Sequence, residues 1–227
     1  MAQAGKAPKA PAALRSEPRV FGAFRRRSSV PSSKQQEVLD VAAAYFLTHG
    51  YQGASINAMA RTSGISKESI YRYFSGKKEL FEAVIDRELA DYKERMQALD
   101  SIIKTTDLRR ALCAVAETVL SVITADRTLA LRRLIFEEAT RSPDVGQHYY
   151  SIGPEQAYTK LEAVFAAHVD HGELDHCALS RHFLALLLHK VILARECRVQ
   201  AEPTPAEISA FSGQVVDDFL KIFLRRE

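Results

Sequence analysis

Residues 54–81 decide the fold, and they read Ala-Ser-Ile-Asn-Ala-Met-Ala-Arg-Thr-Ser-Gly-Ile-Ser-Lys-Glu-Ser-Ile-Tyr-Arg-Tyr-Phe-Ser-Gly-Lys-Lys-Glu-Leu-Phe. Ser55 and Ser66 each stand where a serine caps the start of a helix, and Gly64 between them supplies the positive φ of a tight turn. The stretch therefore predicts two short helices joined by a glycine turn. The apolar residues expected to form a small core between them are Ile56, Met59, Ala60, Ile65 and Ile70.

Helices are also predicted on both sides of this stretch. Ser33-x-x-Gln36 is a capping box that opens a helix ending at Gly50, and a longer helix is expected from Lys77 to about Ala98. The apolar face of the first helix is Val38, Leu39, Ala42, Tyr45 and Phe46. Three short helices followed by a long one suit a helix-turn-helix module, in which the third helix presents its N-terminal residues to a DNA major groove.

Positive charge is concentrated in the front of the chain. Residues 1–34 contain eight basic residues (Lys and Arg) and one acidic residue, and residues 55–78 contain five basic residues and one acidic residue. Residues 96–227, in contrast, contain 15 basic and 18 acidic residues. This distribution indicates a polyanion at one end of the molecule, with a solvated tail as the alternative. Residues 1–31 are expected to be a flexible basic arm, whose Arg25–Arg27 either enter a minor groove or stay solvated.

Composition narrows the class of protein further. The 227 residues carry a net charge of +3, and the longest apolar run, residues 183–188, is far shorter than the roughly 18 residues of a membrane span. Three cysteines in apolar or alternating stretches favour a reducing cytoplasm, with an organellar transit peptide as the alternative for the Arg-rich start. Gly-x-Ser-x-Gly, Gly-x-Gly-x-x-Gly and His-Glu-x-x-His are missing, so we expect neither an enzyme nor a cofactor.

Five spaced motifs follow one another within residues 34–88. They are Phe46-Leu-Thr-His-Gly50-Tyr51, Ser55–Ala60, Gly64-Ile65-Ser66, Tyr71–Phe74 and Lys77–Leu80. In these motifs the chain strongly resembles the TetR family of bacterial transcription regulators. The resemblance implies an all-α fold with a three-helix helix-turn-helix DNA-binding domain followed by a helical ligand-binding and dimerisation domain. It also implies a bacterial protein that works in the cytoplasm at the nucleoid.

Carried over to this chain, the resemblance assigns roles on double-stranded DNA. Contacts to backbone phosphate are expected from Ser55, Tyr71, Tyr73 and Lys77. Contacts to base edges are expected from Lys67, Glu68, Ser69 and Arg72. Asn57 and Ser66 complete the DNA-facing set. Packing against the first helix is the alternative for Tyr71, and simple solvation is the alternative for Glu68.

The reading helix also departs from the family. Many relatives have Gly-Thr where this chain has Glu68-Ser69, His where it has Tyr73, and an acid where it has Lys78. An acidic side chain repels phosphate, so Glu68 either reads a particular base or turns away from the DNA. The operator sequence therefore cannot be taken from better-known relatives.

The second half of the chain predicts five further helices, near residues 107–123, 127–141, 143–171, 175–199 and 205–224. Gly153-Pro154 is expected to break the third of them, and Thr204, Pro205 and Glu207 start the last with a capping box. The resemblance implies that the last two helices form a homodimer interface, with the core of a single subunit as the alternative. The expected interface residues are Phe183, Leu187, Val191, Phe211, Val215 and Phe219.

The remaining helices are expected to enclose a cavity for a small apolar or amphipathic effector, and this half looks loosely similar to AefR-like members. The candidate lining residues are Val115, Val119, Phe136, His148, Tyr149, Tyr158, Phe165, Phe183 and Leu187. Any one of them is more readily explained as plain core than as a ligand contact. A further cluster invites a metal site: His168, His171, His176, Cys177, His182 and His189. A helix break at Gly172-Glu173 argues against it, so no metal is expected.

These interpretations combine into one prediction. We expect a flexible arm over residues 1–31, a DNA-binding domain over 32–76, a connecting helix over 77–98 and a ligand-binding and dimerisation domain over 99–227. The expected function is that of an effector-responsive regulator, a repressor in most of the family, that binds a palindromic operator as a homodimer. A metal-sensing or effector-free DNA-binding regulator of the same fold is the alternative.

Overall fold

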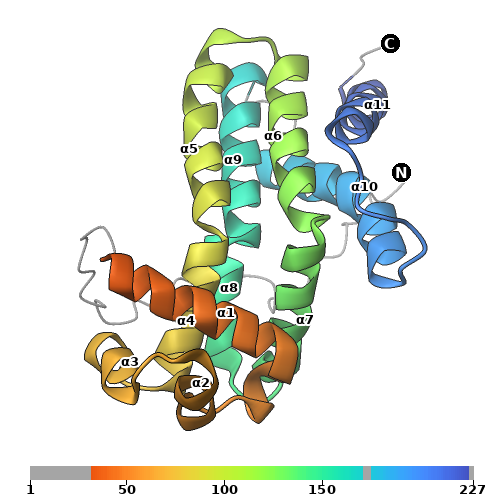
Figure 1. Cartoon of the computed structure of the whole chain (residues 1–227). Helices are drawn as coiled ribbons and strands as arrows, with labels where there is room; N and C mark the ends of the chain where they lie inside the picture. Colours follow the sequence, from red (N-terminus) through yellow and green to blue (C-terminus); the bar gives the residue numbers. More distant parts are fainter. Residues whose placement is uncertain (1–31, 171–174, 225–227) are drawn as a thin grey trace, which may run out of the picture. The chain divides into compact units, whose positions relative to one another are not determined.

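The computed structural model describes residues 32–170 and 175–224, and within these ranges every regular element is a helix (Figure 1). The all-α prediction is therefore confirmed. The helices are α1 (Ser33–Gly53), α2 (Ile56–Ser63), α3 (Lys67–Tyr73), α4 (Lys77–Glu88), α5 (Ala90–Thr105), α6 (Leu108–Ile123), α7 (Asp126–Ala139), α8 (Pro143–Ile152), α9 (Pro154–His168), α10 (His176–Glu196) and α11 (Pro205–Phe223). The expected basic arm lies outside the described residues.

Most helix ends follow the predicted caps. The hydroxyls of Ser55 and Ser66 accept hydrogen bonds from the backbone N–H groups at the starts of α2 and α3, and Gly64 ends α2 with a φ of 74°. Thr204 forms the predicted capping box at the start of α11. One cap is displaced: Ser32, not Ser33, caps α1, because the Ser32 hydroxyl accepts from the N–H of Gln35.

The predicted single helix over residues 77–98 is wrong, since the chain bends at Leu89 between α4 and α5. Leu89 is buried, and a Cβ on Gly153 would lie 3.5 Å from its Cδ1 atom. The bend thus carries Leu89 against the α8–α9 junction, where Gly153 and Pro154 break the chain as predicted. No glycine or proline marks the bend in the local sequence.

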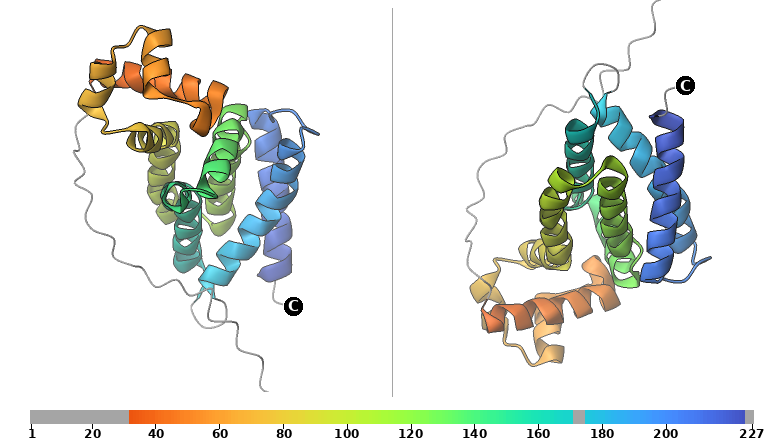
Figure 2. Two further views of the ribbon diagram at one scale, coloured as in Figure 1. Left: turned by 90° about the horizontal axis from the view of Figure 1, so that it is seen from below. Right: turned by 90° about the horizontal axis from the view of Figure 1, so that it is seen from above.

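Two groups of buried side chains form the interior. The first combines α1–α4 with Leu131 and Ile135 of α7 and Val145 and Tyr149 of α8. The second lies among α5, α6, α9, α10 and α11. In Figure 2, α10 and α11 lie on one flank of the α5, α6 and α9 bundle, with α10 packed on α9 and α11 packed on α6. The first four helices therefore share their core with α7 and α8.

Candidate nucleic-acid interface and effector half

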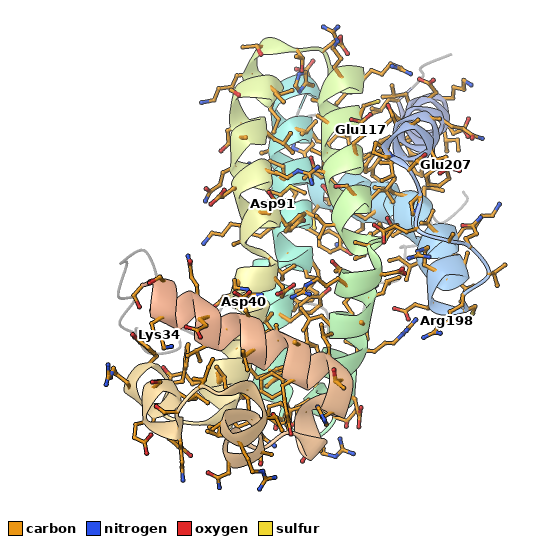
Figure 3. All side chains as sticks on the ribbon, in the orientation of Figure 1. Lys34, Asp40, Asp91, Glu117, Arg198 and Glu207 are labelled. Carbon is orange, nitrogen blue, oxygen red and sulfur yellow. The ribbon has the colours of Figure 1, made fainter. Side chains whose placement is uncertain are left out.

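The helix-turn-helix unit is built on a small buried core. Ile56, Met59, Ile65 and Ile70 are buried as predicted, and Ala60 is half-buried. Because apolar residues occupy the inner side of α2 and α3, their polar residues face outward, and many side chains of these helices project away from α1 (Figure 3). The unit therefore presents a polar surface of the type that a duplex groove accepts.

The predicted DNA-contacting residues fall into two groups by exposure. Exposed side chains belong to Ser55, Asn57, Ser66, Lys67, Glu68, Tyr71 and Arg72. Half-buried side chains belong to Ser69, Tyr73 and Lys77. Among the described residues, Glu68 and Arg72 take part in no ion pair or side-chain hydrogen bond, and the ammonium of Lys67 lies 5.6 Å from the Tyr71 ring centre. Their charges are thus not neutralised by the protein.

Besides Ser55 and Ser66, whose hydroxyls cap α2 and α3, three more of the predicted DNA contacts already have an internal partner. The Ser69 hydroxyl lies 2.9 Å from that of Ser66, and the Ser32 hydroxyl donates to the Tyr73 hydroxyl at 3.2 Å. The Lys77 ammonium donates to the carbonyls of Tyr51 and Ala54 at 3.0 and 3.1 Å and lies 4.4 Å from the Tyr51 ring centre. In this structure Lys77 therefore donates hydrogen bonds to carbonyl groups at the end of α1, and its contact to DNA phosphate stays a prediction.

Several polar contacts that sequence reasoning missed join the DNA-binding helices to the second half. Glu138 of α7 is 2% exposed and accepts from the Gln52 amide at 2.5 Å and from the Ser142 hydroxyl at 2.7 Å. Arg127 forms an ion pair with Glu88 at the end of α4. Gln52 and Glu138 are 86 residues apart in the sequence, and Glu88 and Arg127 are 39 residues apart, so no local sequence pattern could reveal either contact.

The predicted dimer face needs correction. Phe183, Leu187, Val215 and Phe219 are buried in the subunit's own core, so they do not form a surface, while Val191 and Phe211 are half-buried. The exposed apolar side chains on these helices are instead Leu186, Leu193 and Ile222, which we call the outer face. Because α10 is apolar on most of its circumference, its sequence does not reveal which side turns inward.

The outer face carries a shallow groove of about 750 Å³ along α10, which Tyr158 of α9 and Phe223 of α11 also line. By length and composition α10 would be able to cross a membrane, and 28% of its most apolar window is buried inside the subunit. Its inner side, with Phe183 and Leu187, packs as the core of a helical protein does. Its outer side exposes Leu186 and Leu193 beside polar and charged residues that include Arg181, His182 and His189.

The predicted cavity residues do not come together. Val115, Val119, Phe165, Phe183 and Leu187 belong to the α5, α6, α9, α10 and α11 core, which they fill as ordinary packing. The other four lie elsewhere. Tyr149 belongs to the first core and its ring meets that of Phe136, which is 51% exposed; Tyr158 packs on the outside of the second core and lines the groove; and Nε2 of His148 lies 3.1 Å from Oδ1 of Asp86. A single cavity lined by all nine is therefore wrong for this structure.

The histidine cluster holds no metal-like arrangement within the described part of the chain, where no group of three or more His, Cys, Asp or Glu is placed to hold an ion. Both ring nitrogens of His168 lie within 2.9 Å of backbone carbonyl oxygens, those of Val164 and Thr106. His171 lies outside the described residues.

The fold and the exposed α3 surface define a helix-turn-helix regulator with a helical second half, and comparison with known proteins gives the family. Residues 38–84 match the bacterial regulatory proteins of the tetR family, and residues 110–226 match the AefR-like transcriptional repressor C-terminal domain. The chain belongs to the TetR family, as its motifs predicted.

Individual relatives agree with this assignment. FasR, a transcriptional activator from Mycolicibacterium smegmatis, is 33% identical over 124 residues, which cover 54% of this chain and 55% of FasR. The chain thus spans about half the length of this curated relative. A structure described as a TetR-family regulator from Mesorhizobium loti has a TM-score of 0.72 and 23% identity over 86% of this chain and 98% of its own. FadR from Bacillus subtilis in complex with stearoyl-CoA has a TM-score of 0.58 and 16% identity, and the match covers 81% of this chain and 96% of the FadR chain. At these identities the two structures establish the fold alone.

The internal role of Lys77 gives a test by stability. Lys77→Met removes two hydrogen bonds from a charged donor to carbonyls at the end of α1, and we expect a loss of about 1.5–3 kcal/mol in the free energy of unfolding. Lys78→Met is the matched control, because its ion pair with Asp144 is exposed and is worth at most about 1 kcal/mol. Urea unfolding measures both, and equal losses would contradict the internal role.

The His148–Asp86 pair predicts a dependence of stability on pH. The hydrogen bond to Asp86 raises the pKa of His148 above its ordinary 6.5. The folded protein therefore holds the His148 proton more tightly than the unfolded chain does, so protonation of His148 stabilises the fold. This stabilisation is fully present below pH 6.5 and is lost as pH rises through the raised pKa. We therefore expect the Tm to fall more steeply from about pH 6 to 8 in the wild type than in His148→Gln. Parallel Tm curves for the two proteins would disprove it.

Proposed function

We propose that this chain is an effector-responsive transcriptional regulator that binds an inverted-repeat operator as a homodimer. The observation that carries the proposal is the exposed surface of α3, where Lys67, Glu68 and Arg72 form no ion pair or side-chain hydrogen bond among the described residues, on a family-matched helix-turn-helix. In such modules the residues at the start of the recognition helix meet base edges in the major groove. Repression is the mode named for the family that matches residues 110–226.

The homodimer is supported by the outer face of α10 and α11. Leu186 is 44% and Leu193 56% exposed, and the partly exposed Leu188 and Ile192 line the same groove; a second copy of this face would remove these side chains from water by a two-fold contact. Two-fold symmetry also supplies two recognition helices for two half-sites about one DNA turn apart. The exposed residues, rather than Phe183 and Leu187, are the ones we assign to this interface.

Responsiveness to a small molecule is supported by the connections between the two halves. Glu138 and Glu88 tie α7 to α1 and α4, so a change at α7 changes the support of the helix-turn-helix. A ligand can weaken DNA binding only to the extent that it prefers the non-binding state. FadR, which has this fold, is known in complex with stearoyl-CoA, and an amphipathic effector is our proposal for this chain as well.

Selection of bound sequences from random DNA tests the reading surface. We expect Arg72→Ala to relax the preference at one base pair by about 1–3 kcal/mol, because Arg is the usual partner of guanine. Tyr71→Phe, the neighbouring exposed control, removes one neutral phosphate contact and should weaken binding equally on all duplexes. Fluorescence anisotropy at one fixed salt concentration measures the selected site against single-base variants. Equal losses on the selected site and on random duplexes for both variants would refute this division.

Sedimentation velocity tests the dimer. Leu193→Glu places a charge in the middle of the outer face and should convert a dimer into a monomer with unchanged helix content. Val199→Glu is the control, because Val199 is 77% exposed and lies beyond the end of α10. A Leu193→Glu protein that remains dimeric, or a wild type that is monomeric, would exclude this interface.

A further inference from the structure

Arg132 of α7 is a buried cation whose hydrogen bonds are incomplete. The residue is 8% exposed, and its Nε and Nη1 atoms have no hydrogen-bond partner among the described residues. A guanidinium cannot lose its proton at any ordinary pH, so it cannot avoid the cost of burial by becoming neutral. Orphaned donors on a buried charge are rare because they destabilise the fold, and each needs an explanation.

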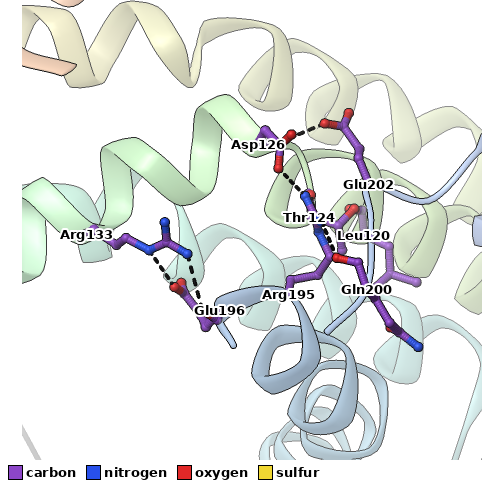
Figure 4. A network of polar contacts seen from close by, with 8 residues as sticks. All are labelled: Leu120, Thr124, Asp126, Arg133, Arg195, Glu196, Gln200 and Glu202. Atoms are coloured by element: carbon purple, nitrogen blue, oxygen red, sulfur yellow. Dashed lines mark hydrogen bonds and ion pairs between the residues drawn. The ribbon is translucent and has the colours of Figure 1, made fainter. Parts of the chain in front are cut away.

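The charges around Arg132 do not balance. Its Nη1 atom lies 3.6 Å from Oε1 of Glu196, which is an ion pair but longer than a hydrogen bond. The other oxygen of Glu196 accepts from Nε of Arg133 at 2.9 Å, and the Glu196 carbonyl lies 3.4 Å from Nη2 of Arg133, as Figure 4 shows. Two arginines therefore share one carboxylate, and one positive charge is left over.

The surroundings of this charge are aromatic. The Cζ atom of Arg132 lies 5.2 Å from the ring centre of Phe136, and the Phe136 ring meets the Tyr149 ring edge-on at 6.2 Å. Phe136 is half-exposed, whereas Tyr149 is buried, so the cluster reaches from the surface to the interior. Burial raises the pKa of the Tyr149 hydroxyl, and the neighbouring Arg132 guanidinium opposes that shift, so the hydroxyl and the guanidinium lie close together.

We propose that Arg132 is the recognition group for the acidic head of the effector, and that the effector is a monocarboxylate with an apolar body. One excess positive charge matches one carboxylate, whose oxygens accept the unused hydrogen bonds of Nε and Nη1. Phe136 and Tyr149 supply the apolar contact beside it. This inference rests on the proposed function, because it names the chemistry of the ligand to which that regulator responds.

The position of Arg132 connects such a ligand to the DNA-binding helices. Arg132 lies on the same helix as Glu138, the partner of Gln52 at the end of α1. Tyr149 lies beside the bend between α4 and α5, because a Cβ on Gly153 would lie 3.6 Å from its ring and 3.5 Å from Leu89. A carboxylate at Arg132 thus acts on the two helices, α7 and α8, that complete the core of the helix-turn-helix.

A ligand-free measurement tests the unbalanced charge. Arg132→Met removes the orphaned cation, leaves Glu196 paired with Arg133, and should raise the Tm of the full chain by about 2–6 °C. Arg133→Met is the matched control, because Arg133 is 41% exposed in its side chain and has a formed hydrogen bond, so its removal should leave the Tm unchanged or lower it. A Tm that falls in Arg132→Met would overturn the assignment, since it would mean that the Arg132 pair is structural.

Calorimetry with matched acids and alcohols tests the ligand class. The probes are hexanoate, decanoate, tetradecanoate and 4-phenylbutyrate, each beside the alcohol with the same body. We expect at least one acid to bind tenfold or more tightly than its alcohol and Arg132→Met to abolish that preference. Arg141→Met, which removes an exposed arginine that pairs with Glu137 and not with Glu196, should retain it. No acid binding, no preference for the acid, or a preference that survives Arg132→Met would each overturn the proposal.

DNA binding by the same preparations separates this inference from the proposed function. If the chain binds its selected operator and an alcohol, but no acid, releases it from that DNA, the proposed regulatory function is supported and the acid-binding role of Arg132 is refuted. If acids bind through Arg132 but no operator is selected, the proposed function fails and the binding site stands.

Discussion

The contact on which the structure depends is the packing of Phe46 against Phe81. Their rings meet edge-on at 4.9 Å, and the Tyr51 ring, which stacks on Phe46 at 5.9 Å, also lies 4.9 Å from Phe81. Phe46 and Phe81 are fully buried, so together they hold α1 on α4 and fix the platform that supports α2 and α3. Because Leu131 and Ile135 of α7 fill the same core, the orientation of the recognition helix is a property of both halves of the chain.

Sequence reasoning succeeded where the determinants are local. Ser55, Gly64 and Ser66 specify two helix starts and a turn by interactions within a few residues, and the structure forms each of them as expected. The Gly153-Pro154 break has the same origin, because proline removes a backbone donor and clashes with the preceding turn. The family motifs are arranged around these local signals, and for this reason the fold of residues 34–88 could be predicted well.

Sequence reasoning failed where a residue has two acceptable environments. Phe183 and Leu186 are both apolar residues on α10, and the positions of α9 and α11 decide that the first is buried and the second is exposed. Leu89 is an ordinary helix former, yet packing against the α8–α9 junction bends the chain there. The Lys77 side chain suits phosphate and carbonyl oxygens equally, and the spatial proximity of Tyr51 directs it inward. Each outcome depends on residues distant in the sequence.

Two buried arginines in the second half differ in how many of their hydrogen-bond donors have acceptors within the protein. Arg195 is 5% exposed and donates to the carbonyls of Thr124 and Gln200 and to the carboxylate of Asp126, so it joins α10 to the start of α7 with its donors used (Figure 4). Arg132 is buried almost as deeply but leaves two donors unused. A fold selected only for stability would replace such a residue by an apolar one of similar size. Arg132 therefore has two donors beside the shared core of the two halves that an acidic partner from outside the chain would use.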